Sequence, residues 1–506
     1  MPSRRYHELD VVRGLAAFIV LLHHVWMSFP QAFHVPPLTG ASGLADYLFF
    51  ALKYTPARFL VAGPGCVAVF FVLSGFVLSA SFENGRGISY GQYVVKRLCR
   101  IYLPFAAAVL VAAGFYAATY KGAIPGMSDW LNTTSWSMPL TPDLVLGHFA
   151  AYGMEPYHDL NAPMWSLIVE LRASLIFPLV FLLVRSRSLW APLLALGLYM
   201  AAAGFMSRDG QTLPMTPLGS LAFLFQWMPL FFLGSALWFQ RERLERFFSG
   251  LPAVARLGLV AMALLLLGMP AWGPVSTTSM AMKLVWMLGM GFSATVIITA
   301  AISTALFHRL AAIRPLRRLG EISYSLYLFH QIVILALAHG LVGIVPPGLA
   351  VLLAIPVSLV VAELGYRLVE TPSMRLGQRL TRGAPRPAAE ARPALEPVSV
   401  TEELGAVMAG EGREDKIRRG QEASGSNEPR RRVSLSAAAP RGCRAHRHGR
   451  CRGSPATGAA RPRRPAGAGG CGPSGGSGRR RWPSAPGVRA DGCSPRCRRP
   501  APSRHG

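Results

Sequence analysis

The chain has 506 residues, of which 51% are hydrophobic and only 15% are charged, whereas soluble domains carry about 25% charged residues. Apolar runs long enough to cross a bilayer recur up to about residue 370, which excludes a set of water-soluble globular domains. We therefore predict an all-α, polytopic integral membrane protein. The net charge of +27 has two origins, because residues 384–506 hold 25 of the 52 basic residues and 10 of the 25 acidic residues.

The first apolar segment, residues 4–29, carries charged and titratable side chains within a run that is apolar on every face. Arg13 and His24 are separated by about three helical turns, so they share one face of the helix about 16 Å apart along its axis. Asp10 lies one turn before Arg13 on nearly the same face. Charges inside such a segment are costly, which points to a function for the three together. Arg13 taken by itself fits equally well a side chain that extends to the lipid headgroups.

The whole series of apolar runs predicts about ten membrane-spanning helices, each close to the roughly 20 residues that a bilayer requires. They lie near residues 11–29, 60–80, 100–119, 163–184, 189–206, 217–239, 253–270, 283–307, 319–340 and 347–369. Every second connecting segment is rich in Arg, which is the positive-inside pattern. We therefore expect a multi-pass protein of the cell inner (plasma) membrane with both termini in the cytoplasm. The longest external loop, near residues 120–162, is predicted to be a lid, an acceptor-binding segment or a plain connector.

Five later motifs place polar side chains in or beside these spans. They are Ser74-Gly75 in the second span, the R-x-x-R pair Arg97 and Arg100 before the third, Trp165, Ser166 and Glu170 in the fourth, Tyr324, Tyr327 and His330 in the ninth, and Glu370 at the end of the last. An intramembrane carboxylate is usually functional or paired, and we expect Glu170 to pair with Arg172 or another core Arg. Ser74-Gly75 is expected to be a close helix contact, and Glu370 a structural tether to a nearby Arg.

Several of these residues also fit plain structural roles. Arg97 and Arg100 could anchor the cytoplasmic end of a helix. Trp165 could anchor at the membrane interface, and Ser166 could bond within its helix. His330 fits a structural and a functional role equally.

The composition changes abruptly after the last span. Residues 1–380 are expected to form the transmembrane domain, and residues 381–429 a polar, disordered linker. Residues 430–506 are rich in Arg, Pro and Gly and contain no Lys, Ile, Met, Phe, Tyr or Asn. That composition favours a frameshift product of a GC-rich gene over an Arg-rich arm for anionic partners. The Cys spacings form no zinc motif, and we expect neither a metal site nor a nucleic-acid partner.

Taken in this order and spacing, the motifs resemble the acyltransferase-3 family, which includes bacterial O-acetyltransferases of surface polysaccharides. The resemblance covers about residues 5–380, and it departs from the commoner pattern where Leu171-Arg172 follows Glu170. It implies transfer of an acyl group, usually acetyl from acetyl-coenzyme A, onto a glycan hydroxyl, with no permanently bound cofactor. The implied partners are acyl-coenzyme A, a glycan or lipid-linked sugar acceptor, and membrane lipids. The family's functional Arg and His carry over to Arg13 and His24, and its R-x-x-R pair to Arg97 and Arg100.

The chemistry of these residue types agrees with that assignment. Imidazole titrates near neutral pH, so His24 suits the role of general base or of acyl relay. Guanidinium groups suit the phosphates of a coenzyme A donor, which assigns Arg13, Arg97 and Arg100 to the donor. We expect Asp10 and Glu170 to complete the catalytic set. Supporting roles are expected for Trp165, Ser166, Tyr324 and His330.

Other functions remain open at this point. The acceptor could be a lipid or a small molecule. A polytopic transporter would also carry intramembrane charges, although the two related halves typical of transporters are not evident. A membrane-bound sensor or scaffold with a basic tail is the remaining alternative.

Overall fold

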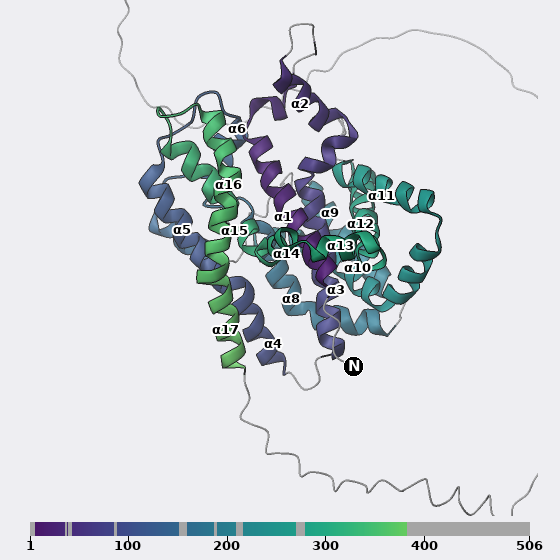
Figure 1. Cartoon of the computed structure of the whole chain (residues 1–506). Helices are drawn as coiled ribbons and strands as arrows, with labels where there is room; N and C mark the ends of the chain where they lie inside the picture. The colour runs from purple at the N-terminus through teal and green to yellow at the C-terminus, as the bar shows by residue number, and fades with distance from the viewer. Residues whose placement is uncertain are drawn as a thin grey trace, which may run out of the picture. The chain divides into compact units, whose positions relative to one another are not determined.

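The computed structural model describes residues 6–35, 38, 43–84, 89–150, 159–186, 190–208, 216–269 and 279–381. The chain divides into two units, Met1–Leu395 and Glu396–Gly506, and all described residues belong to the first. Beyond residue 381, the expected linker and tail lie outside the described residues. Within the described ranges every regular element is a helix, as predicted (Figure 1).

Seventeen α-helices lie within the described ranges. In chain order they are α1 (His7–Met27), α2 (Leu44–Tyr54), α3 (Gly63–Asn84), α4 (Tyr90–Arg97), α5 (Leu103–Thr119), α6 (Asp129–Thr134), α7 (Pro142–Ala150), α8 (Met164–Arg185), α9 (Trp190–Arg208), α10 (Pro217–Gly250), α11 (Ala253–Gly268), α12 (Met280–Ser303), α13 (Ala305–Ala312), α14 (Arg314–Glu321), α15 (Ser323–Gly340), α16 (Pro347–Gly365) and α17 (Thr371–Leu380). Short turns of other helical types lie between them: the 3₁₀ turns η1 (Pro30–Ala32) and η2 (Pro56–Val61), and the π-helical turns η3 (Leu98–Tyr102) and η5 (Tyr366–Glu370).

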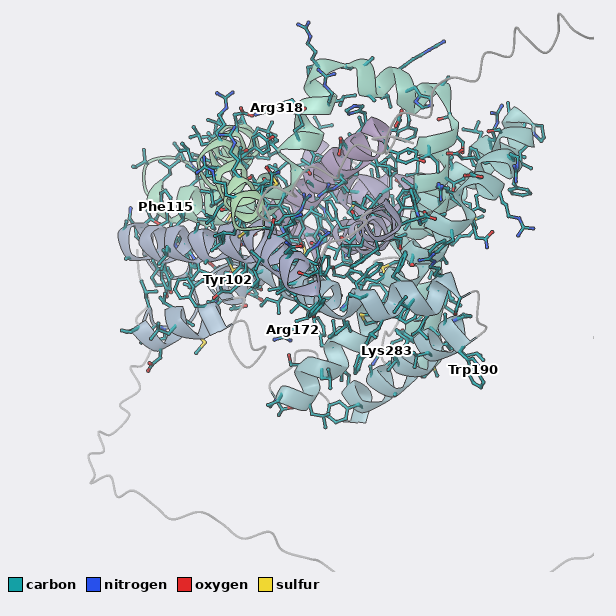
Figure 2. All side chains as sticks on the ribbon, turned by 90° about the horizontal axis from the view of Figure 1, so that it is seen from below. Tyr102, Phe115, Arg172, Trp190, Lys283 and Arg318 are labelled. Carbon is teal, nitrogen blue, oxygen red and sulfur yellow. The ribbon has the colours of Figure 1, made fainter. Side chains whose placement is uncertain are left out.

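Seven of the described helical segments are long and apolar enough to cross a membrane, and the bent pair of helices Arg314–Glu321 and Ser323–Gly340 passes the same test when its two helices are taken together. Two shorter apolar helices, Trp190–Met206 and Ala253–Gly268, occupy the two remaining expected positions. The prediction of a polytopic, all-helical membrane protein is therefore confirmed. Apolar side chains such as Phe115 and Trp190 are exposed at the rim of the helix bundle (Figure 2), where a lipid environment would cover them.

The ninth expected span, near residues 319–340, is not one helix. Its first residues belong to α14, which meets α15 at an angle of 74°. The bend places α14 across α1, where a Cβ atom on Gly14 would lie 2.6 Å from the backbone N of Gly320. Only glycines permit this contact, because two backbones that close leave no room for a side chain.

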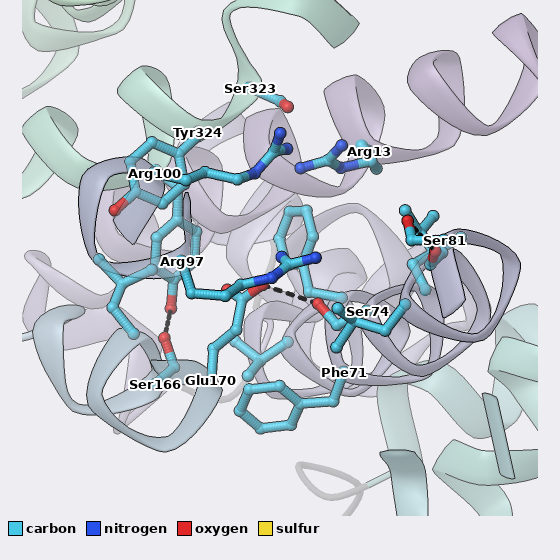
Figure 3. A pocket seen from close by; sticks show the side chains of 17 residues that line it. Arg13, Phe71, Ser74, Ser81, Arg97, Arg100, Ser166, Glu170, Ser323 and Tyr324 are labelled. Carbon is cyan, nitrogen blue, oxygen red and sulfur yellow. Dashed lines mark hydrogen bonds between the residues drawn. The ribbon is translucent and has the colours of Figure 1, made fainter. Parts of the chain in front are cut away.

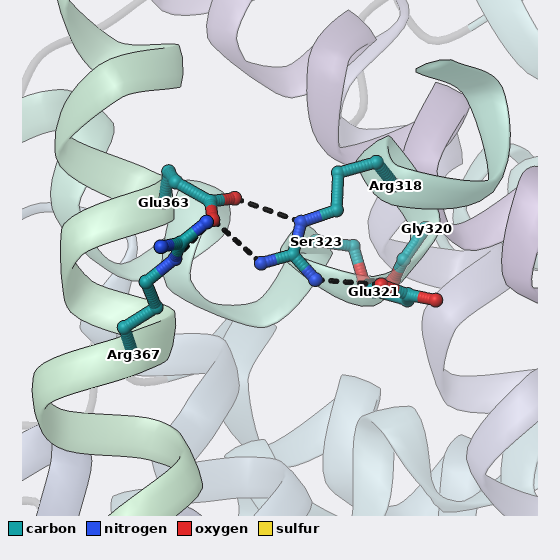
Figure 4. A network of polar contacts seen from close by, with 6 residues as sticks. All are labelled: Arg318, Gly320, Glu321, Ser323, Glu363 and Arg367. Atoms are coloured by element: carbon teal, nitrogen blue, oxygen red, sulfur yellow. Dashed lines mark hydrogen bonds and ion pairs between the residues drawn. The ribbon is translucent and has the colours of Figure 1, made fainter. Parts of the chain in front are cut away.

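Charged side chains fix α14 to α16 on its other side. Arg318 donates to both oxygens of Glu363, at 2.8 and 2.6 Å, and to Glu321 at 2.6 Å (Figure 4). Arg367 also donates to Glu363 at 2.5 Å. This bidentate arrangement holds α14 in a defined orientation between α1 and α16.

The bundle has two distinguishable ends. Figure 1 shows α4 and α17 at the end of the bundle toward which the first residues of α1 point, called here the N-terminal end, with α2 and α6 at the opposite end. The two π-helical turns lie where α4 continues into α5 and where α16 continues into α17. Such turns shift the direction of side chains within a helix and are frequent at functional sites.

Candidate functional site

A polar cavity of about 160 Å³ lies inside the bundle beside the first half of α1. Its lining comes from α1, α3, α4, η3, α8 and α15, which are far apart in the chain. The polar lining residues are Arg13, Ser74, Ser81, Arg97, Arg100, Ser166, Glu170, Ser323, Tyr324 and Tyr327. The fold thus brings together six of the ten residues predicted from the sequence to be catalytic, donor-binding or supporting.

Three guanidinium groups gather over Glu170 in this cavity (Figure 3). Arg13 and Arg97 both lie within electrostatic reach of Glu170, and each also lies within electrostatic reach of Arg100. None of the three Arg side chains forms an ion pair with a carboxylate in the described part of the chain. Their donors therefore remain available to an anionic ligand.

Glu170 has a different close partner from the one predicted. Its Oε1 accepts a hydrogen bond from the Ser74 hydroxyl at 2.8 Å. Arg172, the expected partner, donates instead to Ser220 at 2.5 Å, because it points to another face of α8. The prediction that Arg172 pairs with Glu170 is wrong, whereas the core arginines Arg13 and Arg97 do act on this carboxylate electrostatically.

Ser74 and Gly75 have different roles in the structure. Gly75 makes the expected close helix contact, because a Cβ there would overlap the backbone carbonyl of Phe231 on α10. Ser74 lines the cavity and binds Glu170, a role that the sequence did not indicate.

Glu370 also differs from its expected role. It is 5% exposed in the π-helical turn η5 and accepts a hydrogen bond from the Ser325 hydroxyl at 2.7 Å. It lies within electrostatic reach of Arg100 and Arg13, so it balances charge next to the cavity rather than only tethering a helix end. The π-helical turn that places it there has no recognisable signal in the sequence.

The tyrosines of α15 connect the cavity to the neighbouring elements. The Tyr324 hydroxyl donates to the Ile101 carbonyl in η3 at 2.9 Å, which fixes the π-helical turn that carries Arg100. The Tyr327 and Ser166 hydroxyls are 2.6 Å apart. Trp165 does not line the cavity and packs against Phe71 and other aromatic rings, which makes it a packing residue.

Asp10 lies at the edge of this region. Its carboxylate is 3.7 Å from the Nδ1 of His7, and it lies within electrostatic reach of Arg13. The Asp10 backbone is the surface on which Gly320 packs. Asp10 does not line the cavity, so its position suits charge balance for Arg13.

A pair of histidines lies further along α1. The Nδ1 of His24 is 2.7 Å from the Nε2 of His330, and the Nδ1 of His330 is 3.0 Å from the Leu326 carbonyl. Because that carbonyl accepts only, the network assigns the proton of His330 to Nδ1 and makes its Nε2 an acceptor. His24 then donates from Nδ1, which leaves its Nε2 with a free lone pair.

The described segment that carries α6 contacts this histidine pair. The ring of Trp130 in α6 stacks on His24 with centroids 5.3 Å apart and planes 11° apart. Ser128 fixes α6 to the end of α1 by donating to the Met27 carbonyl at 2.7 Å. The expected lid or acceptor-binding role of this loop stays a prediction. The loop does contact His24, which we expect to be the general base or acyl relay. Among the described residues, no group of three His, Cys, Asp or Glu side chains could hold a metal ion.

Comparison with known proteins decides the family. A family model described as an acyltransferase domain matches residues 6–367. The chain belongs to that acyltransferase family. It is therefore an acyltransferase that moves groups other than amino-acyl groups, and an integral membrane protein.

Three relatives of this acyltransferase illustrate its similarities. It is 28% identical to acyltransferase MdmB of Streptomyces mycarofaciens, over 72% of this chain and 99% of that protein. It is 25% identical to nodulation protein 10 of Rhizobium leguminosarum bv. viciae, over 74% of this chain and 95% of that protein. O-acetyltransferase OatA of Staphylococcus aureus is 23% identical, over 67% of this chain and 58% of that protein. No solved structure matches the acyltransferase significantly.

Proposed function

We propose that this acyltransferase moves an acyl group, acetyl in the first instance, from acyl-coenzyme A to a hydroxyl of a cell-envelope or exported glycan. The observation that carries the proposal is the bond from His24 to His330, which leaves the Nε2 of His24 unprotonated and available as a base. A sugar hydroxyl is a weak nucleophile at neutral pH and needs such a base. The names of relatives such as O-acetyltransferase OatA support transfer to oxygen.

In the proposed reaction the acceptor hydroxyl attacks the carbonyl carbon of the thioester. The new C–O bond forms while the C–S bond breaks, and the hydroxyl proton passes to the Nε2 of His24 and then to the departing thiolate. His330 stabilises the imidazolium of His24 by accepting its other N–H. The cationic cavity around Arg13, Arg97 and Arg100 binds the negatively charged donor.

The proposed placement in the membrane follows from charge. The helices α4 and α17 lie at the N-terminal end of the bundle (Figure 1). Because Lys96 and Arg97 in α4 and Arg379 in α17 are cationic, we place that end at the cytoplasmic face of the inner membrane. Coenzyme A is cytoplasmic, and the acceptor would meet the opposite end, near Trp130 and His24.

The test is a deletion strain of the source organism, complemented with the intact gene, with His24→Ala or with His34→Ala. His34 is an exposed histidine of the connection after α1 and serves as the matched control. At equal membrane expression, we expect base-labile acetyl esters on the envelope glycans with the intact gene and with His34→Ala, but not with His24→Ala. If His24→Ala restored the esters fully, the proposed role of His24 would be wrong. If no glycan changed with the intact gene, the glycan acceptor would be wrong.

A further inference from the structure

A buried cation lies next to the last turns of α1 and does not belong to the arginine-lined cavity. Arg58 is in the 3₁₀ turn η2, and its side chain is only 5% exposed. Its Nε and Nη1 atoms are buried and have no hydrogen-bond partner among the residues that the structure describes. No carboxylate in those ranges forms an ion pair with it. A buried charge without such a partner is destabilising, which indicates that it is retained for binding.

Aromatic rings connect Arg58 to the histidine pair. The guanidinium carbon lies 4.2 Å from the centroid of the Trp26 ring in α1. The Trp26 ring stacks in turn on that of His23, with centroids 6.1 Å apart and planes 30° apart. The rings of His23 and His24 have centroids 5.4 Å apart. Two aromatic rings therefore separate Arg58 from the histidine that we propose as the base.

The turn that carries Arg58 is attached firmly to α1. The Nδ1 of His23 donates to the Val61 carbonyl at 2.8 Å, since a carbonyl oxygen only accepts. A Cβ on Gly63 would overlap the ring of His23, so the start of α3 packs directly on the same side chain. These contacts fix η2 against α1, and the position of the guanidinium group near His24 therefore belongs to the folded bundle.

The surroundings of Arg58 are cationic. Lys53, in the last turn of α2, lies within electrostatic reach of it. Lys53 donates to a backbone carbonyl, which does not neutralise its charge. The sequence from residue 29 to residue 61 contains a single carboxylate, Asp46, which accepts from a backbone N–H at the start of α2 at 3.0 Å. Two cations thus favour a negatively charged group at this end of the bundle.

We propose that Arg58 binds an oxyanion of the acceptor, a carboxylate or a phosphate, and thereby selects an acidic glycan over a neutral one. The inference rests on the proposed function and deepens it, because it assigns the chemical class of the acceptor. A guanidinium group binds either oxyanion through two parallel N–H donors. The face of Trp26 stabilises the cation without occupying these donors. Arg58 determines specificity, since it holds the acidic group while the reacting hydroxyl meets His24.

The experiment uses the complemented deletion strain, and glycan fragments that carry base-labile acetyl esters are separated by anion exchange. The intact gene is compared with Arg58→Met, Arg58→Lys and Lys121→Ala at equal membrane expression. Arg58→Met retains an apolar stem over Trp26 and removes the charge, whereas Arg58→Lys retains a charge. Lys121→Ala is the matched control, because it removes an exposed cation of the connection after α5.

With the intact gene, we expect the esters on fragments that the anion exchanger retains. Arg58→Met should lower their amount by at least about tenfold. Arg58→Lys should preserve part of it, and Lys121→Ala should leave it unchanged. Carbodiimide reduction removes a carboxylate and hydrogen fluoride removes a phosphate, so loss of retention after one of these treatments identifies the oxyanion.

Thermal unfolding of the purified chain separates binding from a structural role. A buried charge that has no partner within the chain lowers stability, so Arg58→Met should leave the melting temperature unchanged or raise it when no acceptor is present. A melting temperature below that of the unmodified chain would show that Arg58 supports the fold, and the inference would be overturned.

The remaining outcomes separate this inference from the proposed function. If the esters lay on neutral fragments, or if Arg58→Met left their amount intact, the acidic acceptor would be wrong and the proposed acyl transfer would stand. If Arg58→Lys were no better than Arg58→Met, or if Lys121→Ala caused the same loss, a specific charge at Arg58 would not be responsible, and the inference would also fall. If the intact gene gave no glycan ester, the proposed acceptor would be wrong, and this inference would fall with it.

Discussion

The cationic cavity and the histidine pair are both polar regions inside an apolar bundle, yet they satisfy their polar groups in opposite ways. Around the cavity, Arg13, Arg97 and Arg100 keep donors that no described carboxylate pairs. At the histidine pair, the ring nitrogens are bonded to each other or to a backbone carbonyl, except for the Nε2 of His24. We therefore interpret the first region as the proposed binding site, because its guanidinium groups lack a carboxylate partner among the described residues, and the second as the proposed reaction site, because the Nε2 of His24 keeps a lone pair.

The largest effect is expected from His24→Ala, which changes the histidine pair and leaves the cavity intact. Loss of the base should lower the rate of acyl transfer by about 10²–10⁴-fold. The affinity for coenzyme A should not change, because His24 does not line the cavity. Rates from purified chain, with coenzyme A affinity measured on the same preparation, check both parts. A variant with an unchanged rate, or with lost donor affinity, would contradict the division into two regions.

Arg100→Ala tests the opposite case, because it changes the cavity and leaves the histidine pair intact. Removing one charged donor should weaken coenzyme A binding by about 10–100-fold. The rate at saturating donor should fall much less, since the histidine pair is untouched. Titration calorimetry and saturation kinetics measure the two quantities. An equal loss in kcat at saturating donor would instead make Arg100 part of the reaction site.

The histidine pair itself can be tested by two substitutions at one position. His330→Leu removes the acceptor that orients His24, and we expect kcat to fall by about ten- to a hundredfold with the KM for donor unchanged. His330→Gln retains an acceptor oxygen and should recover part of that loss. If both variants were equally inactive at equal folded yield, His330 would act through packing rather than through its hydrogen bond.

The smallest effect is expected from a change at the close contact between α1 and α14. Gly320→Ala adds a Cβ against the Asp10 backbone and should cost about 1–3 kcal/mol of stability. Gly258→Ala is the control, because a Cβ there meets nothing within 4 Å. Melting temperatures of the purified chain in detergent should fall for the first variant and not for the second. Equal temperatures for both would show that the two helices can separate without cost.

The sequence predicted the parts of the site that depend on local pattern. Apolar run length predicted the spans, and the three-turn spacing on α1 correctly separated Arg13 from His24. The contacts between distant segments could not be predicted in this way. The bond from His24 to His330 joins residues 306 positions apart, and nothing in either span specifies the partner. The same limit explains why Arg172, one of the expected partners of Glu170, bonds Ser220 instead, since residues two positions apart on a helix face different neighbours.

Tyr327 has a consequence for how far an acyl group must travel. Its hydroxyl bonds to Ser166 at the cavity, while its ring lies 5.9 Å from that of His330. One side chain therefore contacts both the cavity and the histidine pair. A hydrocarbon bilayer is about 30 Å thick, whereas these two polar regions inside the bundle are linked through a single phenol ring. Under the proposed function, an acyl group would pass this ring on its way from the donor to His24.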